Sequence, residues 1–275
     1  MKIIDIGQQR HVTLKLFTDN QPHVELVDIE RNDDVTVICS LTDSLKILQL
    51  QLLVNALNAK GCKRKKLIIP YLMAARSDRH MTDDHSDSYD LQVIADIINR
   101  LEFDTVLVFD VHSDVSLGLI HNCFNVPNDI LLEAYGLENA VLIFPDAGAG
   151  KKAKKLLKKM PSVTDVIFCS KERNLGTQEL ELQVLNPSLC EDRNVVIVDD
   201  LCDGGRTFTA ILKQLPKTKT ATLIIGHSLF SYGTKELETY FTNIITSDST
   251  KRNFESKDGF LKVVPVTDYL CQYQY

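Results

Sequence analysis

Residues 194–208 read Asn-Val-Val-Ile-Val-Asp-Asp-Leu-Cys-Asp-Gly-Gly-Arg-Thr-Phe, and this stretch predicts both a fold class and a binding loop. A β-branched run ends in two carboxylates, and a third carboxylate, two glycines, an arginine and a threonine precede an apolar run that can begin a helix. Glycines let backbone N–H groups approach a phosphate, and a helix N-terminus favours negative charge. The carboxylates would repel that phosphate, so they suit ribose hydroxyls or a phosphate-bound Mg²⁺. A sugar phosphate fits both halves, held by Asp199, Asp200, Asp203, Gly204, Gly205, Arg206 and Thr207.

The alternative interpretation of this stretch is a strand, turn and helix with a solvated acidic turn. Three carboxylates so close together beside two glycines are costly to place without a counter-charge, which argues against that alternative. The stretch is not a Walker A loop, because G-x-x-x-x-G-K-[ST] is absent from the chain. Cys202 lies inside the motif, and its aspartate neighbours should raise its pKa, so we expect a structural role for it rather than a nucleophilic one.

Composition indicates an ordinary globular protein with enough apolar material for two cores. The chain has 275 residues, of which 44% are hydrophobic and 25% charged, and its net charge is −6. The negative charge argues against nucleic-acid binding, and no apolar run is long enough to predict a membrane span. Seven scattered cysteines, never in C-x-x-C spacing, favour reduced thiols and a cytoplasmic location without a zinc site.

Apolar strand candidates alternate with helical ones along the chain, which predicts an α/β fold with parallel sheets covered on both faces. Leucines at helical spacing predict a helix over 43–57, with Asp43 as its N-cap. Pro127, Asn128, Asp129 and Gly136 cluster in the segment 126–140 and favour a domain boundary there. Strands are expected over 35–39, 66–70, 105–111, 141–144, 166–169, 195–198, 222–226 and 243–246, and further helices over 90–101, 150–159, 206–214 and 234–240.

Polar clusters fall at the carboxyl ends of these strands, where ligands bind in such sheets. His112 and Asp146 each follow a predicted strand and could share one Mg²⁺, although His112 taken alone fits a hydrogen-bonding loop residue better than a metal ligand. Arg76 and Arg79 flank Asp78 and suit polyphosphate oxygens, with a surface salt-bridge cluster as the alternative. Lys171-Glu172-Arg173 precedes a polar, glycine-containing stretch that could close over a phosphate, unless it is simply a solvated loop. The segment 78–90 contains five aspartates and two histidines. We expect a mobile acidic loop there rather than a metal site.

The order of these segments resembles that of the ribose-phosphate pyrophosphokinases, from about residue 14 to residue 272. Phe17-Thr18-Asp19 is similar to the family's Phe-Ser-Asp-Gly-Glu, and Pro70-Tyr71 with Ala75-Arg76-Ser77-Asp78-Arg79 to its Pro-Tyr and Ala-Arg-Gln-Asp-Arg. Asp110-Val111-His112-Ser113 matches Asp-Leu-His-Ala/Ser, Pro145-Asp146-Ala147-Gly148 matches Pro-Asp-Xaa-Gly, and Lys171-Glu172-Arg173 matches Lys-Arg-Arg. Residues 199–207 resemble the ribose-phosphate loop, and 226–231 resemble Thr-His-Gly-Xaa-Phe-Ser. Each motif is weak alone, but their joint order is specific.

The resemblance implies two tandem type I phosphoribosyltransferase-like, Rossmann-like domains. The first would cover 1–135 and bind ATP, and the second would cover 136–275 and bind the ribose phosphate. The resemblance also allows the last residues of the chain to pack on the first domain. It also implies pyrophosphoryl transfer from Mg-ATP to the anomeric hydroxyl of ribose 5-phosphate, with release of AMP, in a homodimer or higher homo-oligomer. Its implied ATP-binding residues are Phe17, Asp19, Arg76, Ser77, Asp78, Arg79 and His112; its metal ligands are His112 and Asp146; and its catalytic residues are Lys171 and Arg173.

Several departures from the family pattern keep other functions open. The opening strand-and-helix portion is expected to be missing, Asn20-Gln21 replaces Gly-Glu, and Ser77 replaces Gln. Arg206 stands where the family usually has a small glycine in Asp-Thr-Gly-Gly-Thr. This substitution suggests an acceptor whose 5-phosphate belongs to a diphosphate, such as ADP-ribose on a route to NAD, as in short phage-type relatives. A phosphoribosyltransferase and a non-catalytic regulatory paralogue are the remaining alternatives.

Overall fold

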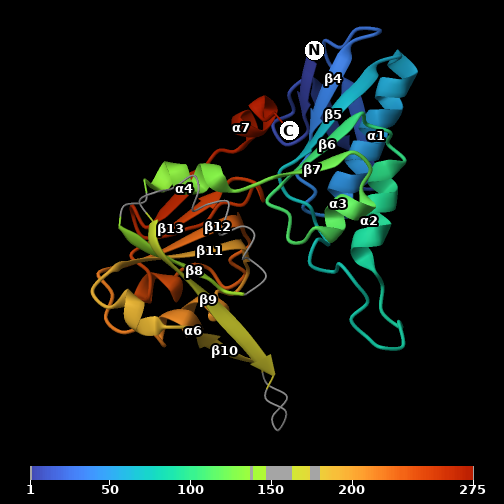
Figure 1. Cartoon of the computed structure of the whole chain (residues 1–275). Helices are drawn as coiled ribbons and strands as arrows, with labels where there is room; N and C mark the ends of the chain where they lie inside the picture. The colour runs from blue at the N-terminus through green and yellow to red at the C-terminus, as the bar shows by residue number, and fades with distance from the viewer. Residues whose placement is uncertain (1, 137–138, 147–162, 174–179, 275) are drawn as a thin grey trace. The chain divides into compact units, whose positions relative to one another are not determined.

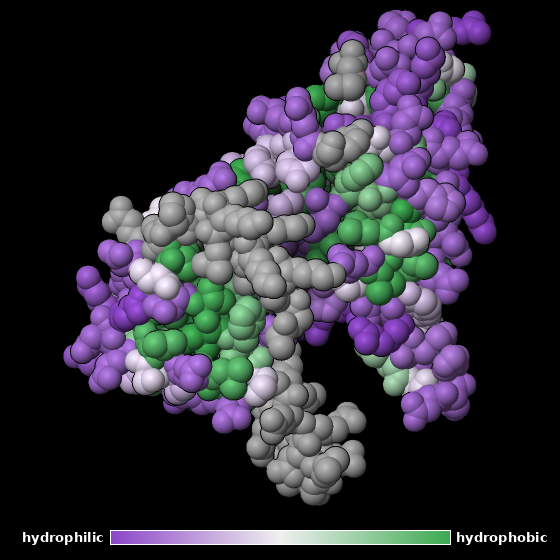
Figure 2. All heavy atoms as spheres, viewed as in Figure 1, coloured by the Kyte–Doolittle hydropathy of each residue, from purple (hydrophilic) through white to green (hydrophobic). Residues whose placement is uncertain are grey.

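The chain forms two compact units, each built on its own sheet (Figure 1). The computed structural model describes residues 2–136, 139–146, 163–173 and 180–274, with the backbone alone at 171–173 and 180–181. The first unit comprises Met1–Pro127, Ser249–Lys251 and Pro265–Tyr275, and the second comprises Asn128–Asp248 and Arg252–Val264. Among the described residues, no helix is long and apolar enough to cross a membrane. The face seen in Figure 2 is mostly hydrophilic, with apolar side chains gathered in smaller patches on each unit.

The first unit contains a five-stranded parallel sheet whose strand order follows the chain. Because parallel strands in sequential order take right-handed connections, the helices fall on one face, as Figure 1 shows for α1, α2 and α3. A separate hairpin packs on α1. The elements are β1 (Lys2–Asp5), β2 (Val12–Leu16), β3 (Pro22–Leu26), β4 (Asp34–Ile38), α1 (Ser44–Lys60), β5 (Lys63–Ile69), α2 (Asp90–Asn99), β6 (Thr105–Phe109), α3 (Val115–Leu119) and β7 (Cys123–Val126).

Helix α1 shows how local sequence determines an element. Its predicted N-cap is confirmed, because the Asp43 carboxylate accepts a hydrogen bond of 3.0 Å from the Lys46 backbone N–H. The helix ends at Gly61, which adopts φ +78°, a conformation that glycine takes without a steric penalty. Leu50, Leu53 and Leu57 lie on the buried face and fix α1 against the sheet.

The second unit contains a seven-stranded sheet in the order β10-β9-β8-β11-β12-β13-β14, parallel except for the antiparallel β10. The chain leaves β8 towards β9 and returns to pair β11 on the other side of β8, so the switch point of the sheet lies between β8 and β11. The elements are α4 (Asp129–Tyr135), β8 (Ala140–Phe144), β9 (Val163–Arg173), β10 (Leu180–Val184), η2 (Pro187–Cys190), β11 (Asn194–Cys202), α6 (Arg206–Leu212), β12 (Thr220–Ser228), η3 (Leu237–Thr239), β13 (Asn243–Ser247) and β14 (Leu261–Val264).

The α/β class with parallel sheets is confirmed, but two expectations about the elements are wrong. The predicted helix over 234–240 is only the short 3₁₀ turn η3, because Thr234 turns its hydroxyl to the Glu255 carbonyl (3.0 Å) and the Glu238 carboxylate (3.0 Å). The opening strand, expected to be missing, is present as β1, which pairs with β4. The predicted helix over 150–159 lies outside the described residues.

The division between the units falls inside the predicted boundary segment 126–140, eight residues before residue 135 (135 − 127). The chain enters the second unit after Pro127, because α4 packs on β12 and β13 of the second sheet. The last segment, with α7 (Thr267–Gln272), belongs to the first unit, where the buried Val266 and Leu270 contribute to its interior.

Candidate active site

The loop after β11 is shaped by its two glycines. Gly205 is the N-cap of α6 and adopts φ +78°, and a Cβ added there would lie 2.7 Å from Cδ2 of Leu237. A Cβ added at Gly204 would lie 3.1 Å from the ring of Tyr232. The packing against Leu237 and Tyr232 therefore requires glycine at both positions. Arg206 and Thr207, the first residues of α6, are exposed.

The predicted carboxylates of this loop lie at different depths. Asp199 and Asp200 are half-buried at the end of β11, and the Asp200 N–H donates to Oδ1 of Asp199 (2.9 Å). Asp203 is exposed and is tied to the segment after β12, because its side chain accepts a hydrogen bond from the Ser231 hydroxyl and its carbonyl accepts one from the Ser231 N–H (3.3 Å). The segment 226–231, singled out in the sequence, therefore braces the loop.

Asp146 reaches the same edge of the second sheet. Ile143 of β8 pairs with Ile197 of β11, so Asp146 and Asp200 each follow that pair by three residues (146 − 143 and 200 − 197). Asp146 is half-buried. The fold thus brings the predicted metal ligand to the switch point beside the ribose-phosphate loop, which is where α/β sheets bind ligands. The glycines after Asp146 lie outside the described residues.

Two residues near the site have properties that sequence reasoning missed or misjudged. Asn128, noticed only as part of a boundary, is fully buried, donates to the Asp199 carbonyl (3.4 Å) and has a buried Oδ1 without a partner. In the sequence, Asn128 is visible only as a polar residue directly before a helix. Sequence alone does not distinguish such a buried residue from an exposed helix N-cap. Burial raises the pKa of the Cys202 thiol to about 12, with Asp199 and Asp203 adding to the effect, so the expected shift is present but burial is its larger cause.

In the first unit, two predicted ATP segments come together after β5 and β6. The Asp78 carboxylate is buried and accepts a hydrogen bond of 2.9 Å from Nε of Arg79, whose side chain is 73% exposed. The Arg79 guanidinium lowers the pKa of Asp78, and Ser113 and His112 lower it further, so the segments 76–79 and 112–113 share one electrostatic environment. Arg76 and His112 are exposed. Asp110, directly after β6, adopts φ +43°, a backbone conformation that aspartate tolerates better than most residues.

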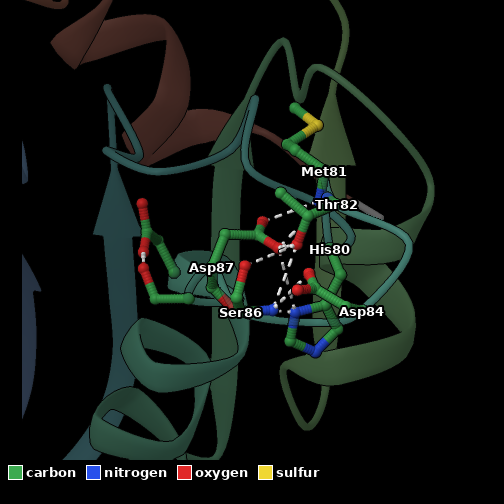
Figure 3. Close-up of polar contacts among 8 residues, drawn as sticks. His80, Met81, Thr82, Asp84, Ser86 and Asp87 are labelled. Atoms are coloured by element: carbon green, nitrogen blue, oxygen red, sulfur yellow. Dashed lines mark hydrogen bonds and ion pairs between the residues drawn. The ribbon is translucent and has the colours of Figure 1, made fainter.

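The loop that follows the segment 76–79 is held together by hydrogen bonds to the Asp87 carboxylate (Figure 3). This carboxylate accepts hydrogen bonds from the Thr82 hydroxyl (2.6 Å), the Met81 N–H (2.6 Å) and the Thr82 N–H (3.1 Å). These bonds, that of the Thr82 hydroxyl first, hold the pKa of Asp87 well below its usual range. The rings of His80 and His85 stack with their centroids 4.4 Å apart. Within the described part of the chain, no group of three or more His, Cys, Asp or Glu residues could hold a metal ion.

The remaining predicted residues lie on two antiparallel ribbons. Phe17 stands at the tip of the β2–β3 hairpin with half of its surface exposed (52%), and Asp19 accepts a hydrogen bond from the Gln21 N–H (3.1 Å). Asn20, which replaces the family's glycine, adopts φ +65°, a conformation that asparagine tolerates better than most residues. Lys171 and Arg173 end β9, where their backbones pair with Leu182 and Leu180 of β10.

Of the two predicted metal ligands, Asp146 offers the oxygen donor that Mg²⁺ prefers. Magnesium typically binds one or two protein groups and completes its shell with water and substrate phosphates, so a single half-buried carboxylate at this sheet edge fits a metal that arrives with a polyphosphate. His112 belongs to the first unit and Asp146 to the second.

Comparisons with known proteins match both units. Residues 5–101 match the model of the N-terminal domain of ribose phosphate pyrophosphokinase, and residues 128–258 match that of the phosphoribosyl transferase domain. A ribose-phosphate pyrophosphokinase of Vibrio vulnificus is 27% identical over 266 residues, covering 93% of this chain and 77% of the relative. That of Hyphomonas neptunium is 24% identical over 274 residues, covering 94% and 85%. The fold is similar to the crystal structure of phosphoribosylpyrophosphate synthetase from Mycobacterium smegmatis, with a TM-score of 0.78 and 19% identity over 94% of this chain and 87% of that one.

Proposed function

Because the chain belongs to the ribose-phosphate pyrophosphokinase family, we propose that it transfers the diphosphoryl group of Mg-ATP to the anomeric hydroxyl of ribose 5-phosphate. The anomeric oxygen forms a bond to the β-phosphorus, and the bond from that phosphorus to the α–β bridging oxygen breaks. AMP leaves with the bridging oxygen, and the proton of the anomeric hydroxyl passes to solvent. The observation that carries the proposal is the acidic, glycine-rich loop at the switch point of the second sheet.

Each part of this loop has a separate task in the proposal. The N-terminus of α6 and the backbone from Asp203 to Thr207 hold the 5-phosphate, where glycines permit a close approach. Asp199 and Asp200, half-buried and at the strand end, accept hydrogen bonds from the ribose hydroxyls. Mg²⁺ supplies charge neutralisation of the polyphosphate when bound, and His112 and Asp146 would be its protein ligands.

The cationic residues complete the proposed reaction. Arg76 and Arg79 are exposed and would bind the ATP phosphates, while the buried Asp78 fixes the Arg79 guanidinium through the 2.9 Å hydrogen bond. Lys171 and Arg173 would neutralise the charge that develops on the transferred group, because transfers of this kind depend mainly on positioning and electrostatics. The exposed Phe17 at the hairpin tip would contact adenine, and we propose a homo-oligomer in which that tip reaches a neighbouring subunit.

The same chemistry on ADP-ribose is a second candidate, favoured by the position of Arg206. This arginine is the exposed first residue of α6, directly after the αL glycine, where a second phosphate attached to the first would lie within reach of its side chain. The product would be ADP-ribose 1-diphosphate, whose activated anomeric carbon suits a later nicotinamide addition in NAD synthesis.

All seven cysteines are free, which supports a location in the reducing cytoplasm.

An assay of AMP release with each acceptor tests the proposal. The protein is incubated with ATP and Mg²⁺, and ribose 5-phosphate or ADP-ribose is added separately. We expect AMP in equal amount to a sugar 1-diphosphate with one of the two acceptors. AMP with neither acceptor would contradict the kinase proposal and favour a phosphoribosyltransferase or a regulatory paralogue.

Replacement of Arg206 tests which acceptor the loop selects. If Arg206 binds a second phosphate, Arg206→Gly should shift the ratio of kcat/KM for ADP-ribose over ribose 5-phosphate by about tenfold or more towards ribose 5-phosphate. The control is Lys217→Gly, which removes an exposed cation outside helix α6. Lys213 is not used because it is the C-cap of α6, the helix that begins with Arg206. An unchanged ratio in Arg206→Gly would remove the basis for the ADP-ribose candidate.

A further inference from the structure

A pocket of about 260 Å³ opens in the first unit among residues that have no part in the proposed reaction. It lies at the carboxyl ends of the parallel strands β1 and β4, which pair through Asp5 and Ile38. Beyond that pair, the Ile6 N–H continues the ladder to the Ile38 carbonyl (3.0 Å), and the chain then enters the first turn of α1. The carboxyl edge of a parallel sheet is where α/β folds place their ligands.

A buried carboxylate forms one side of this pocket. Asp5 is only 2% exposed, and its Oδ1 accepts hydrogen bonds from the Gly7 N–H (2.8 Å) and the Gln8 N–H (3.0 Å). Both bonds use the same oxygen, so Oδ2 is left to accept a donor. A buried carboxylate is costly unless its oxygens are hydrogen-bonded, and a hydroxyl group of a ligand would satisfy Oδ2.

Two lysines give the pocket a positive charge despite Asp5. Lys46, in the first turns of α1, is half-buried, and its Nζ donates one hydrogen bond to Oε1 of Gln49 (3.1 Å). An ammonium group carries three N–H donors, so Lys46 retains capacity for an anion. Lys251 lines the pocket from the segment Ser249–Lys251, which the Ser40 hydroxyl anchors through a hydrogen bond of 2.7 Å to the Ser249 carbonyl.

We propose that this pocket binds a small phosphorylated polyol. Its phosphate group lies against Lys46 and Lys251, and one of its hydroxyl groups donates to Oδ2 of Asp5. Inorganic phosphate can offer Oδ2 only a P–OH group of the same anion that the lysines bind, whereas a polyol phosphate offers a separate, neutral hydroxyl group. A whole nucleotide exceeds the volume, which is below the range of about 300–1,000 Å³ typical of sites for drug-sized ligands. The ligand is therefore the size of a triose or pentose phosphate.

Titration of the full chain with glycerol 3-phosphate tests this site, since that compound has no anomeric hydroxyl. Binding is followed by the backbone amide resonances of Gly7 and Gln8 and by calorimetry. We expect these two resonances to shift, and Lys46→Gln and Lys251→Gln each to weaken binding by about tenfold through loss of a charge-assisted hydrogen bond. Lys60→Gln, an exposed lysine at the other end of α1, is the matched control and should leave the affinity unchanged.

Two further variants separate the carboxylate's role from that of the active site. Asp5→Asn keeps an acceptor for the Gly7 and Gln8 N–H groups, and it should abolish the preference for glycerol 3-phosphate over inorganic phosphate. Asp199→Asn should leave glycerol 3-phosphate binding intact, whatever it does to activity. The proposal is overturned if the Gly7 and Gln8 amides do not shift at millimolar ligand, if Asp199→Asn abolishes binding, or if neither lysine variant that folds weakens binding.

Discussion

Individual residues in the site are held in conformations that their neighbours enforce. Gly205 is confined by Leu237 and adopts a left-handed backbone, whereas Gly136, with φ +71°, has no atom within 4 Å of an added Cβ. Asp78 is hydrogen-bonded to Arg79, and Asn20 adopts a left-handed backbone at a position where the family pattern has a glycine. At this scale, the chemistry of each side chain depends on one or two specific contacts.

Gly205→Ala should destabilise the protein more than Gly136→Ala. Both variants place a Cβ at positive φ, which costs roughly 1–2 kcal/mol. Only Gly205→Ala also forces Leu237 to move, which adds about 1–3 kcal/mol of overpacking. Urea unfolding followed by circular dichroism measures the difference, and equal losses in the two variants would contradict the packing assigned to Leu237.

Asp78 should make stability depend on pH in the acidic range. Its pKa is lowered in the folded state, so its contribution is present above the unfolded pKa of about 4 and is lost as pH falls through the lower folded pKa. Asp78→Asn should therefore lower the free energy of unfolding at pH 6–7, and the gap from wild type should narrow towards pH 3. The exposed Asp114→Asn serves as control. A gap that persists unchanged at low pH would show that the carboxylate charge is not responsible.

At the scale of elements, the proposed site residues lie either at the ends of parallel strands or on antiparallel ribbons. The ends of β8 and β11 carry the groups proposed for the metal and the sugar phosphate, because their pairing puts Asp146 and Asp200 at the same level. The β9–β10 ribbon carries Lys171 and Arg173 beyond the parallel part of the sheet. The loop folded on Asp87 follows the proposed ATP segment and is stabilised by its own hydrogen bonds (Figure 3).

Lys171→Ala should lower kcat strongly and change the KM for ATP little. A cation that acts mainly on charge developed during transfer contributes to the transition state rather than to ground-state binding. We expect a loss of about 10²–10³ in kcat, measured by AMP release at saturating substrates. The exposed Lys217→Ala is the matched control. A large increase in KM with kcat unchanged would instead assign Lys171 to substrate binding.

For the whole molecule, the sequence predicted the fold class better than the details of its edges. Buried runs such as those of β6, β8 and the first part of β11 (195–198) were found because nearly every residue in them is apolar. The hairpin β2–β3 and the strands β10 and β14 were missed, because short, half-exposed edge strands carry a weak apolar signal. The return of α7 to the first unit was anticipated only through the family resemblance, because it depends on contacts distant in sequence that no local pattern encodes.

The site was predictable to the extent that its motifs are contiguous. The residues from Asp199 to Thr207 were recognisable because strand, turn and helix start follow one another directly. Three features could not be predicted from the sequence, because each depends on how a side chain packs in the folded chain. They are the burial of Asn128, the hydrogen bond from Ser231 to Asp203 and the hydrogen bond from Arg79 to Asp78. The catalytic and binding roles of the motif residues remain predictions.

The transfer of an intact diphosphoryl group is the central claim, and labelled ATP tests it most directly. The protein is incubated with Mg²⁺ and the acceptor that supports turnover, using ATP labelled with ³²P at either the α- or the β-phosphorus, and the products are separated. We predict that the α-label appears in AMP and the β-label in the sugar product, because the bond at the β-phosphorus breaks. Retention of the β-label in ADP would show transfer of a single phosphoryl group and would contradict the account.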